Sequence, residues 1–235
     1  MLAPCCEDGP SSPTTAASEV LVLRVQTEHF RLYGDRIADA VLRDVADRLE
    51  ANYARVLADL SVAAVQPVSV KVWQDQASWN AAVQAYFGRS LDTSGYVTGP
   101  GEVRVLNGAR VAQNAVHEFC HTVSLYVNPG LPSSSRWLWE TVALYENDEL
   151  VDPRTLDYLV RGNPPTLDQL NADFAASRQV YEVGYLIGEF VVTRFGRAAF
   201  VQLIRANGDT AAVLGLSPQG FQEAWYAYVR ERYLS

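Results

Sequence analysis

The sequence predicts an α+β fold in which a mixed β-sheet with covering helices comes first and a helical lobe follows. Stretches with the period-two alternation or the β-branched composition of strands all lie before about residue 108. Long stretches with apolar residues at helical spacing separate them, and from about residue 109 onward the pattern is helical. We therefore expect a sheet lobe over about residues 19–108 and a helical lobe over about residues 109–235, within one domain or as two lobes that share a cleft.

The first ordered elements are one or two strands and a long helix. Val20–Val25 and Phe30–Tyr33 are rich in residues that favour strands. Asp35 is predicted to cap the helix, because its carboxylate can accept hydrogen bonds from free backbone N–H groups. From Ile37 to Leu60, apolar residues recur at helical spacing with charged residues between them, which predicts an amphipathic helix packed on a sheet.

A strand, a short helix and a pair of strands follow. In Val68–Trp73, valines alternate with polar residues, which predicts a strand with one buried face. The stretch from Asp75 to Phe87 predicts a shorter helix that ends at Gly88, because glycine readily takes the left-handed conformation of a C-cap. Gly95–Leu106 has a Gly/Pro turn between two short runs and predicts two strands.

The helical lobe is predicted to consist of helices separated by proline, glycine or asparagine. Gly184 and Gly188 permit a neighbouring helix to approach closely. A loop is expected from Leu131 to Ser135. The predicted helices run from about Ala109 to Tyr126, Arg136 to Glu146, Arg178 to Phe195, Arg197 to Ala206, and from a cap at Ser217-Pro218 onward.

Composition excludes several classes of partner. The net charge of -8 argues against nucleic acid or an anionic membrane surface, because both repel an acidic protein. No apolar run approaches the ~20 residues that a transmembrane helix needs, so no transmembrane segment is expected. Cys5 and Cys6 lie near the N-terminus and only Cys120 lies in the body, which excludes a disulfide framework for the core. The oligomeric state is left open.

The N-terminal stretch over residues 1–18 is predicted to be a disordered tether. It lacks periodicity, and its second part is rich in Ser, Thr, Pro and Ala. Leu2-Ala3-Pro4-Cys5 resembles the end of a bacterial lipoprotein signal, although the apolar region of such a signal is missing. Either the signal is incomplete in this chain or the likeness is accidental. We expect an extracytoplasmic protein, secreted or lipid-anchored at Cys5, with a cytoplasmic protein as the alternative.

Residues 117–121 have the sequence His-Glu-Phe-Cys-His, in a chain with only three histidines. On a helix, His117 and His121 project from the same face one turn apart, so two imidazole nitrogens can reach one tetrahedral zinc ion. Glu118 places a carboxylate beside the ion without binding it, where it can accept a proton from metal-bound water. The pattern predicts a zinc site with a general base. The competing interpretation is two surface histidines on an ordinary helix.

Two histidines leave such a site one protein ligand short, and Glu140 is the predicted third ligand. It lies on an otherwise apolar segment, where an unpaired buried carboxylate would be costly, and coordination of zinc removes that cost. A solvated helix charge is the alternative. His29 is interpreted as an exposed strand histidine, and Cys120 as a small buried residue that points away from the two histidines.

Two further features surround this predicted site. Glu146, Asp148 and Glu149 are expected to be solvated at a helix end, with the alternative that one of them orients a metal-bound histidine. The strands predicted in Gly95–Leu106 precede the histidine helix directly. They form either a plain hairpin or an edge strand that binds an extended substrate by β-addition.

The spacing of these residues resembles that of the gluzincin metallopeptidases. Glu140 follows the second histidine after eighteen residues, as in the aminopeptidase N-like group, and Trp139–Ala143 is similar to the N-E-G-x-A sequence around that group's glutamate ligand. Trp139 and Thr141 depart from its Asn and Gly. Tyr181–Gly184 is similar to the Y-E-K-G sequence of the same enzymes. The resemblance implies that the Tyr181 hydroxyl stabilises the transition state, with Tyr185 as the alternative donor and a buried packing tyrosine as another interpretation.

The order of predicted elements from about Glu28 to Tyr233 also resembles the bacterial peptidase MA-like domain. This resemblance implies a zincin-like catalytic domain over residues 19–235. Ser124 and Val127 stand where a metzincin has Gly and His, and Met1 is the only methionine, so the metzincin Met-turn is absent. The G-x-M-E-N sequence with which aminopeptidases bind a free amino terminus is also absent, which favours an endopeptidase.

The sequence therefore predicts a zinc-dependent metallopeptidase that acts on a peptide or protein substrate. His117, His121 and Glu140 are the expected ligands of one zinc ion, with water as the fourth ligand, Glu118 as the general base and Tyr181 as the oxyanion donor. The alternative from another class is a catalytically silent zinc-binding surface module. Hydrolysis of a non-peptide amide or ester is a third hypothesis.

Overall fold

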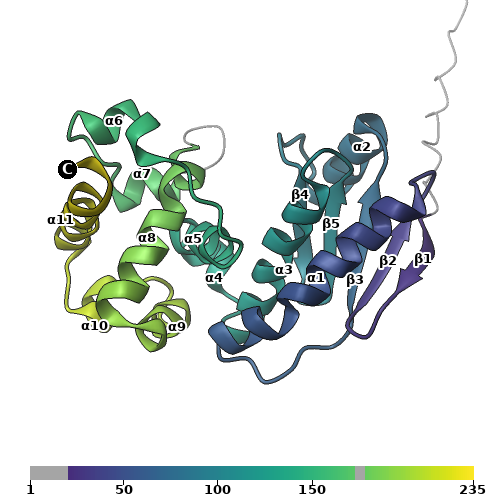
Figure 1. The fold of residues 1–235 in the computed structure, drawn as a ribbon, viewed down its shortest axis with the longest axis horizontal. Helices are drawn as coiled ribbons and strands as arrows, with labels where there is room; N and C mark the ends of the chain where they lie inside the picture. Colours follow the sequence, from purple (N-terminus) through teal and green to yellow (C-terminus); the bar gives the residue numbers. More distant parts are fainter. Residues whose placement is uncertain (1–20, 173–177) are drawn as a thin grey trace, which may run out of the picture.

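The computed structural model describes residues 21–172 and 178–235, and the predicted tether over residues 1–18 lies outside this range. The described chain is a mixed α/β structure, with a sheet and its helices on one side and a group of helices on the other (Figure 1). The α+β expectation is confirmed at the level of a mixed α/β fold. None of the described helices is long and apolar enough to span a membrane.

The described residues contain one five-stranded mixed sheet with the strand order β1-β2-β3-β5-β4. The two central pairings, β2 with β3 and β3 with β5, are parallel, whereas β1 and β4 each pair antiparallel at an edge. The strands are β1 (Val22–Gln26), β2 (Phe30–Gly34), β3 (Val68–Trp73), β4 (Gly95–Gly99) and β5 (Glu102–Leu106). β4 is therefore one of the two edge strands of the sheet.

The two faces of the sheet bury different apolar groups. Val70 and Val105 are fully buried against α1 (Asp39–Asp59) and α3 (Val111–Val127), and for Val70 the alternation in Val68–Trp73 predicts this. On the opposite face, Trp79 of α2 (Gln76–Phe87) packs with Trp73 and Tyr96. The histidine helix α3, predicted to open the helical lobe, therefore packs beside α1 and the sheet (Figure 1).

The C-cap predicted for α2 is confirmed, and the N-cap predicted for α1 is wrong. The Asp75 carboxylate accepts hydrogen bonds from two backbone N–H groups at the start of α2, and Gly88 ends that helix with φ 69°. In contrast, α1 begins after Ala38, which caps it without a side-chain hydrogen bond. Asp35 instead pairs with Arg36 at the surface. Several residues separate Asp35 from the first helical turn, so its carboxylate caps no N–H group there.

The helical side contains α5 and α8 at its centre, where the sequence predicts helices. The predicted loop at residues 131–135 contains the short helix α4, and further short helices lie within residues 147–172. Ser217 caps α11 by accepting a hydrogen bond from the Gly220 N–H group. The elements are α4 (Leu131–Ser134), α5 (Arg136–Glu146), η1 (Pro153–Thr155), α6 (Asp157–Val160), α7 (Leu167–Asn171), α8 (Gln179–Phe195), α9 (Arg197–Arg205), α10 (Thr210–Leu214), α11 (Pro218–Val229) and the π-helical turn η2 (Arg230–Leu234).

Two glycines bring α8 against α5, as predicted. A Cβ atom at Gly188 would lie 2.6 Å from Cβ of Tyr145, and one at Gly184 would lie 3.4 Å from Cα of Thr141. At Gly188 this distance leaves no room for a larger side chain without a shift of Tyr145 on α5. At Gly184 the tightest contact is with Cδ1 of Leu144, 2.5 Å away, which would have to move. This close packing fixes the position of α8 along the axis of α5. It thereby also fixes α8 relative to Glu140, which lies one turn before Leu144 on α5.

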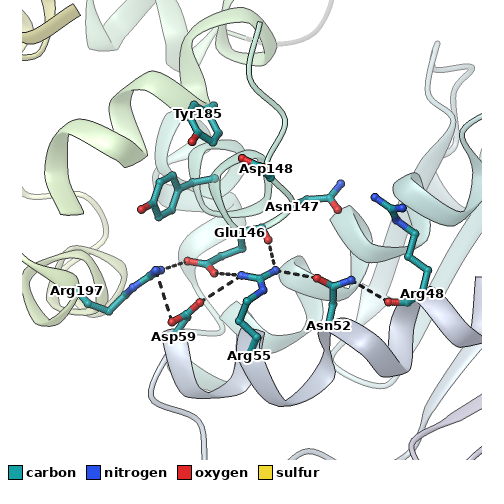
Figure 2. A pocket seen from close by; sticks show the side chains of 10 residues that line it. Arg48, Asn52, Arg55, Asp59, Glu146, Asn147, Asp148, Tyr185 and Arg197 are labelled. Atoms are coloured by element: carbon teal, nitrogen blue, oxygen red, sulfur yellow. Dashed lines mark hydrogen bonds and ion pairs between the residues drawn. The ribbon is translucent and has the colours of Figure 1, made fainter. Parts of the chain in front are cut away.

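An ionic cluster joins α1 to the helical side (Figure 2). Glu146, at the end of α5, has a fully buried side chain, so the prediction that it is solvated is wrong. Arg55 of α1 and Arg197 of α9 both bind its carboxylate, and Arg197 also lies 3.5 Å from Asp59. The cluster lines a cavity of about 440 Å³. Two guanidinium groups supply the partners without which a buried carboxylate is costly.

Candidate metal centre

Three buried side chains from two helices converge at one point. His117 and His121 project from the same face of α3, and Glu140 faces them from α5. The Nε2 atoms of the two histidines lie 3.5 Å and 3.6 Å from Oε2 of Glu140. One ligand atom from each residue lies within 4.8 Å of the others. The three residues are therefore close enough to hold a metal ion, as the sequence predicts.

The charges in this cluster are strongly coupled. Burial would raise the pKa of Glu140, but hydrogen bonds from His117 and His121 hold the pKa well below its usual range. Burial also opposes a charge on His117, yet Glu140 and Glu149 raise its pKa to about 10. The pKa of His121 is lowered by burial. In the absence of a metal ion, the buried Glu140 carboxylate thus has His117 as its main cationic partner.

A second carboxylate orients His117. Nδ1 of His117 lies 2.8 Å from Oε1 of Glu149, just after α5, so the ring presents Nε2 to Glu140. Glu149 in turn accepts hydrogen bonds from the Asn147 side chain at 2.7 Å and from Arg110 at 2.9 Å. Its side chain is 15% exposed, so the prediction that it is solvated is wrong and the alternative, a carboxylate that orients a histidine, fits. Asp148 is exposed, as predicted.

His121 is held by packing. The indole ring of Trp139 stacks on its imidazole with ring centroids 4.0 Å apart and an interplanar angle of 7°. Nδ1 of His121 is buried and has no hydrogen-bond partner among the described residues. The Trp139 ring therefore supports His121 by stacking.

Glu118 lies at the border between α3 and the edge strand β4. Its side chain is almost buried, and no donor in the described part of the chain hydrogen-bonds to it. A Cβ atom at Gly95 would lie 2.5 Å from Oε1 of Glu118. Any residue other than glycine at this position would therefore displace the Glu118 carboxylate. Burial raises the pKa of Glu118 to about 8. Such a carboxylate can both accept and release a proton near neutral pH.

The structure distinguishes the two candidate tyrosines on α8. The Tyr181 hydroxyl donates a hydrogen bond to Oε1 of Glu140 at 2.9 Å. The Tyr185 ring instead packs on Tyr145 and lines the cavity beside Glu146 (Figure 2). Burial and the Glu140 carboxylate raise the pKa of Tyr181, which keeps its hydroxyl protonated. Tyr181 is the one of the two that reaches the site.

His29 and Cys120 lie in other surroundings. His29 lies in the turn between β1 and β2, where its Nδ1 atom is 2.7 Å from Glu50 and its ring stacks on Tyr53. It is part-buried and paired, so the prediction of an exposed strand histidine is wrong. Cys120 is fully buried in the core, as predicted, and burial raises the pKa of its thiol.

Sequence reasoning did not single out Gly95, Asn147 or Asn114. Asn114 lies one turn before Glu118, and its side chain donates to the Ser94 hydroxyl at 3.0 Å, which fixes β4 against α3. Its place on the same helix face as Glu118 is a signal that the sequence does contain. Gly95 lies against Glu118, and Asn147 donates a hydrogen bond to Glu149. No local sequence pattern predicts these two roles.

The fold and the site together define a mixed α/β protein with a buried His/His/Glu site that can hold a metal ion. No model of a known protein family matches the chain, and no curated protein sequence matches it. Any function for this site has to be inferred from its geometry and its sequence motif.

Replacing Glu149 is expected to weaken metal binding without abolishing it. In Glu149→Gln, His117 loses the carboxylate that fixes its orientation and basicity, which typically costs about 10- to 100-fold in metal affinity. Competition with a chelator measures the dissociation constant. Asp148→Asn is the matched control, because Asp148 is the exposed neighbour and should leave the affinity unchanged. Equal affinities of the two variants would contradict the role of Glu149.

Metal affinity is expected to rise with pH. The metal-free protein binds a proton on His117, whose pKa is about 10, and the metal-bound protein does not. Each unit of pH between about 6 and 8 should therefore raise the affinity about tenfold, and metal binding should release at least one proton. Affinity titrations across pH, and calorimetry in buffers of different ionisation enthalpy, measure the two quantities. An affinity independent of pH would refute the paired state of His117.

Proposed function

We propose that this protein is a zinc-dependent metallopeptidase of the gluzincin type with a zincin-like fold. The observation that carries the proposal is the His/His/Glu geometry. Ligand atoms bound to zinc at about 2.1 Å in a tetrahedron lie about 3.4 Å apart. The Nε2 atoms lie 3.5 Å and 3.6 Å from Oε2 of Glu140, close to this separation, and all three ligand atoms lie within 4.8 Å of one another. Two nitrogens and one oxygen leave one position open, as catalytic zinc sites do.

Glu118 is the proposed general base. A zinc ion at this site would polarise a peptide carbonyl and lower the pKa of water from 15.7 to about 7. Glu118 follows His117 on α3 and lies almost buried beside the ligands, so its carboxylate can take the proton of the attacking water. The same carboxyl group then delivers the proton to the departing amine. A structural zinc site has no use for such a base and usually has four protein ligands.

Tyr181 is the proposed donor to the developing oxyanion. Its hydroxyl already reaches Oε1 of Glu140 and remains protonated at neutral pH. A negative oxygen that develops beside Glu140 would compete for the same hydrogen atom. The donor therefore needs only to turn from one acceptor to a neighbouring one, and it contributes most when the oxyanion forms.

The proposed substrate is an extended peptide that adds to the edge strand β4. This strand is the last in the sheet, and it begins at Gly95, in contact with Glu118. A peptide paired with β4 would therefore pass next to the proposed base. The absence of G-x-M-E-N from the sequence favours cleavage within a peptide over removal of its first residue.

The substitution Glu118→Gln tests the proposal directly. It is expected to lower kcat for peptide cleavage at least about 100-fold, because the amide cannot accept the proton, while metal content stays at one ion per chain. A broad peptide library read by mass spectrometry, together with metal analysis, gives both results. Glu223→Gln, on an exposed face of α11, is the control. Bound metal without cleavage by the wild type would favour the silent zinc-binding module.

Tyr181→Phe is expected to lower kcat by about 100- to 1000-fold, since one oxyanion donor is removed. KM and metal content should change little. Tyr185→Phe is the matched control, because its hydroxyl lies at the Glu146 cavity and should leave kcat unchanged. Steady-state kinetics on a peptide from the library measures both. Full activity of Tyr181→Phe would disprove this assignment.

A further inference from the structure

The outer edge of β4 has two places at which a peptide backbone could pair. Gly95 lies opposite Val105 on β5, and the Leu106 N–H group donates to the Ser94 carbonyl at 2.9 Å. This bond identifies Gly95 and Val105 as a non-hydrogen-bonded pair of an antiparallel ladder. The N–H and C=O groups of Gly95 therefore point away from β5, toward the edge. By the same alternation, those of Val97 do so as well.

Only one of these two places is open. The Thr93 hydroxyl donates to the Gly95 carbonyl at 2.6 Å, and the Gly95 N–H group donates back to Thr93 Oγ1 at 3.3 Å. One side chain thus occupies both polar groups of Gly95. The N–H and C=O groups of Val97 have no hydrogen-bond partner in the described part of the chain.

The Thr93 side chain is held firmly in this position. Its own carbonyl accepts a hydrogen bond of 2.7 Å from the indole N–H group of Trp79, which is fully buried. The next residue, Ser94, accepts the hydrogen bond from Asn114 on α3. Thr93 is therefore anchored from both faces of the sheet, at the point where Gly95 touches Glu118.

We propose that Thr93 is a specificity-determining residue, which closes the edge of β4 beside Glu118 and restricts an extended peptide to pairing at Val97. This inference rests on the proposed peptidase function and adds a substrate class to it. The peptide must keep a free N–H group at the residue that pairs with Val97. Two residues along, opposite Gly95, it needs none, so proline or another N-alkylated residue is accepted there.

The test compares backbone N-methylated peptides in three proteins. A peptide whose cleavage site has been mapped with the wild type is methylated at one backbone nitrogen at a time. Each peptide is then titrated, with a fluorescent label, into zinc-loaded Glu118→Gln protein that carries Thr93, Thr93→Ser or Thr93→Val. Binding is read instead of cleavage, so methylation of the scissile bond does not interfere. The steric effect of each methyl group on the dissociation constant is the same in the three proteins, so it cancels when they are compared.

With Thr93 or Thr93→Ser, one nitrogen is expected to be sensitive, by about 2- to 10-fold in the dissociation constant, the effect of one hydrogen bond. The nitrogen two residues from it, toward Glu118, should be insensitive. Thr93→Val removes the hydroxyl and exposes Gly95, so this second nitrogen should become sensitive and the unmethylated peptide should bind more tightly. Thr93→Ala serves in its place if thermal unfolding shows that valine destabilises the protein.

Two negative results have different meanings. If the wild type cleaves peptides but the three proteins have the same pattern of sensitive nitrogens, the role of Thr93 is overturned and the peptidase function stands. The same holds if two nitrogens are already sensitive with Thr93 present. If the wild type cleaves no peptide in the library, the proposed function fails, and this inference fails with it.

Discussion

The structure depends on the compensation of one buried charge. The Glu140 carboxylate is buried between α3 and α5. An unpaired charge there would carry a large desolvation free energy. Two imidazoles and the Tyr181 hydroxyl surround it. These partners come from α3 and α8, and Glu140 itself lies on α5, so the packing of the three helices has to be accurate at this point. The glycines that let α8 approach α5 serve the same requirement.

The periodic parts of the fold could be predicted from the sequence because their causes are local. The alternation in Val68–Trp73 and the glycine C-cap at Gly88 act within a few residues, and the structure has them where they were expected. The start of α1 could not be predicted from Asp35, since a cap depends on where the chain enters the helix and not on residue type alone.

The candidate site divides in the same way. His117 and His121 belong to one helical turn, so their spacing alone brings them together, and Glu140 was predicted because a carboxylate on an apolar segment needs a partner. The surroundings of Glu146 were missed, and those of Glu149 were expected only as the alternative in which a carboxylate orients a histidine. Both were expected to be solvated because they end a helix, but their partners come from distant parts of the chain, which no local pattern reports.

The stacking of Trp139 on His121 has a consequence for how this protein can be studied. An indole ring responds to the charge and polarity of the group on which it lies, and here that group is a candidate ligand 4.0 Å away. Trp139 is thus an intrinsic optical reporter at the site. Because the ring is largely buried, solvent contributes little to its signal, and binding at the site is expected to change the Trp139 part of the emission of the five tryptophans.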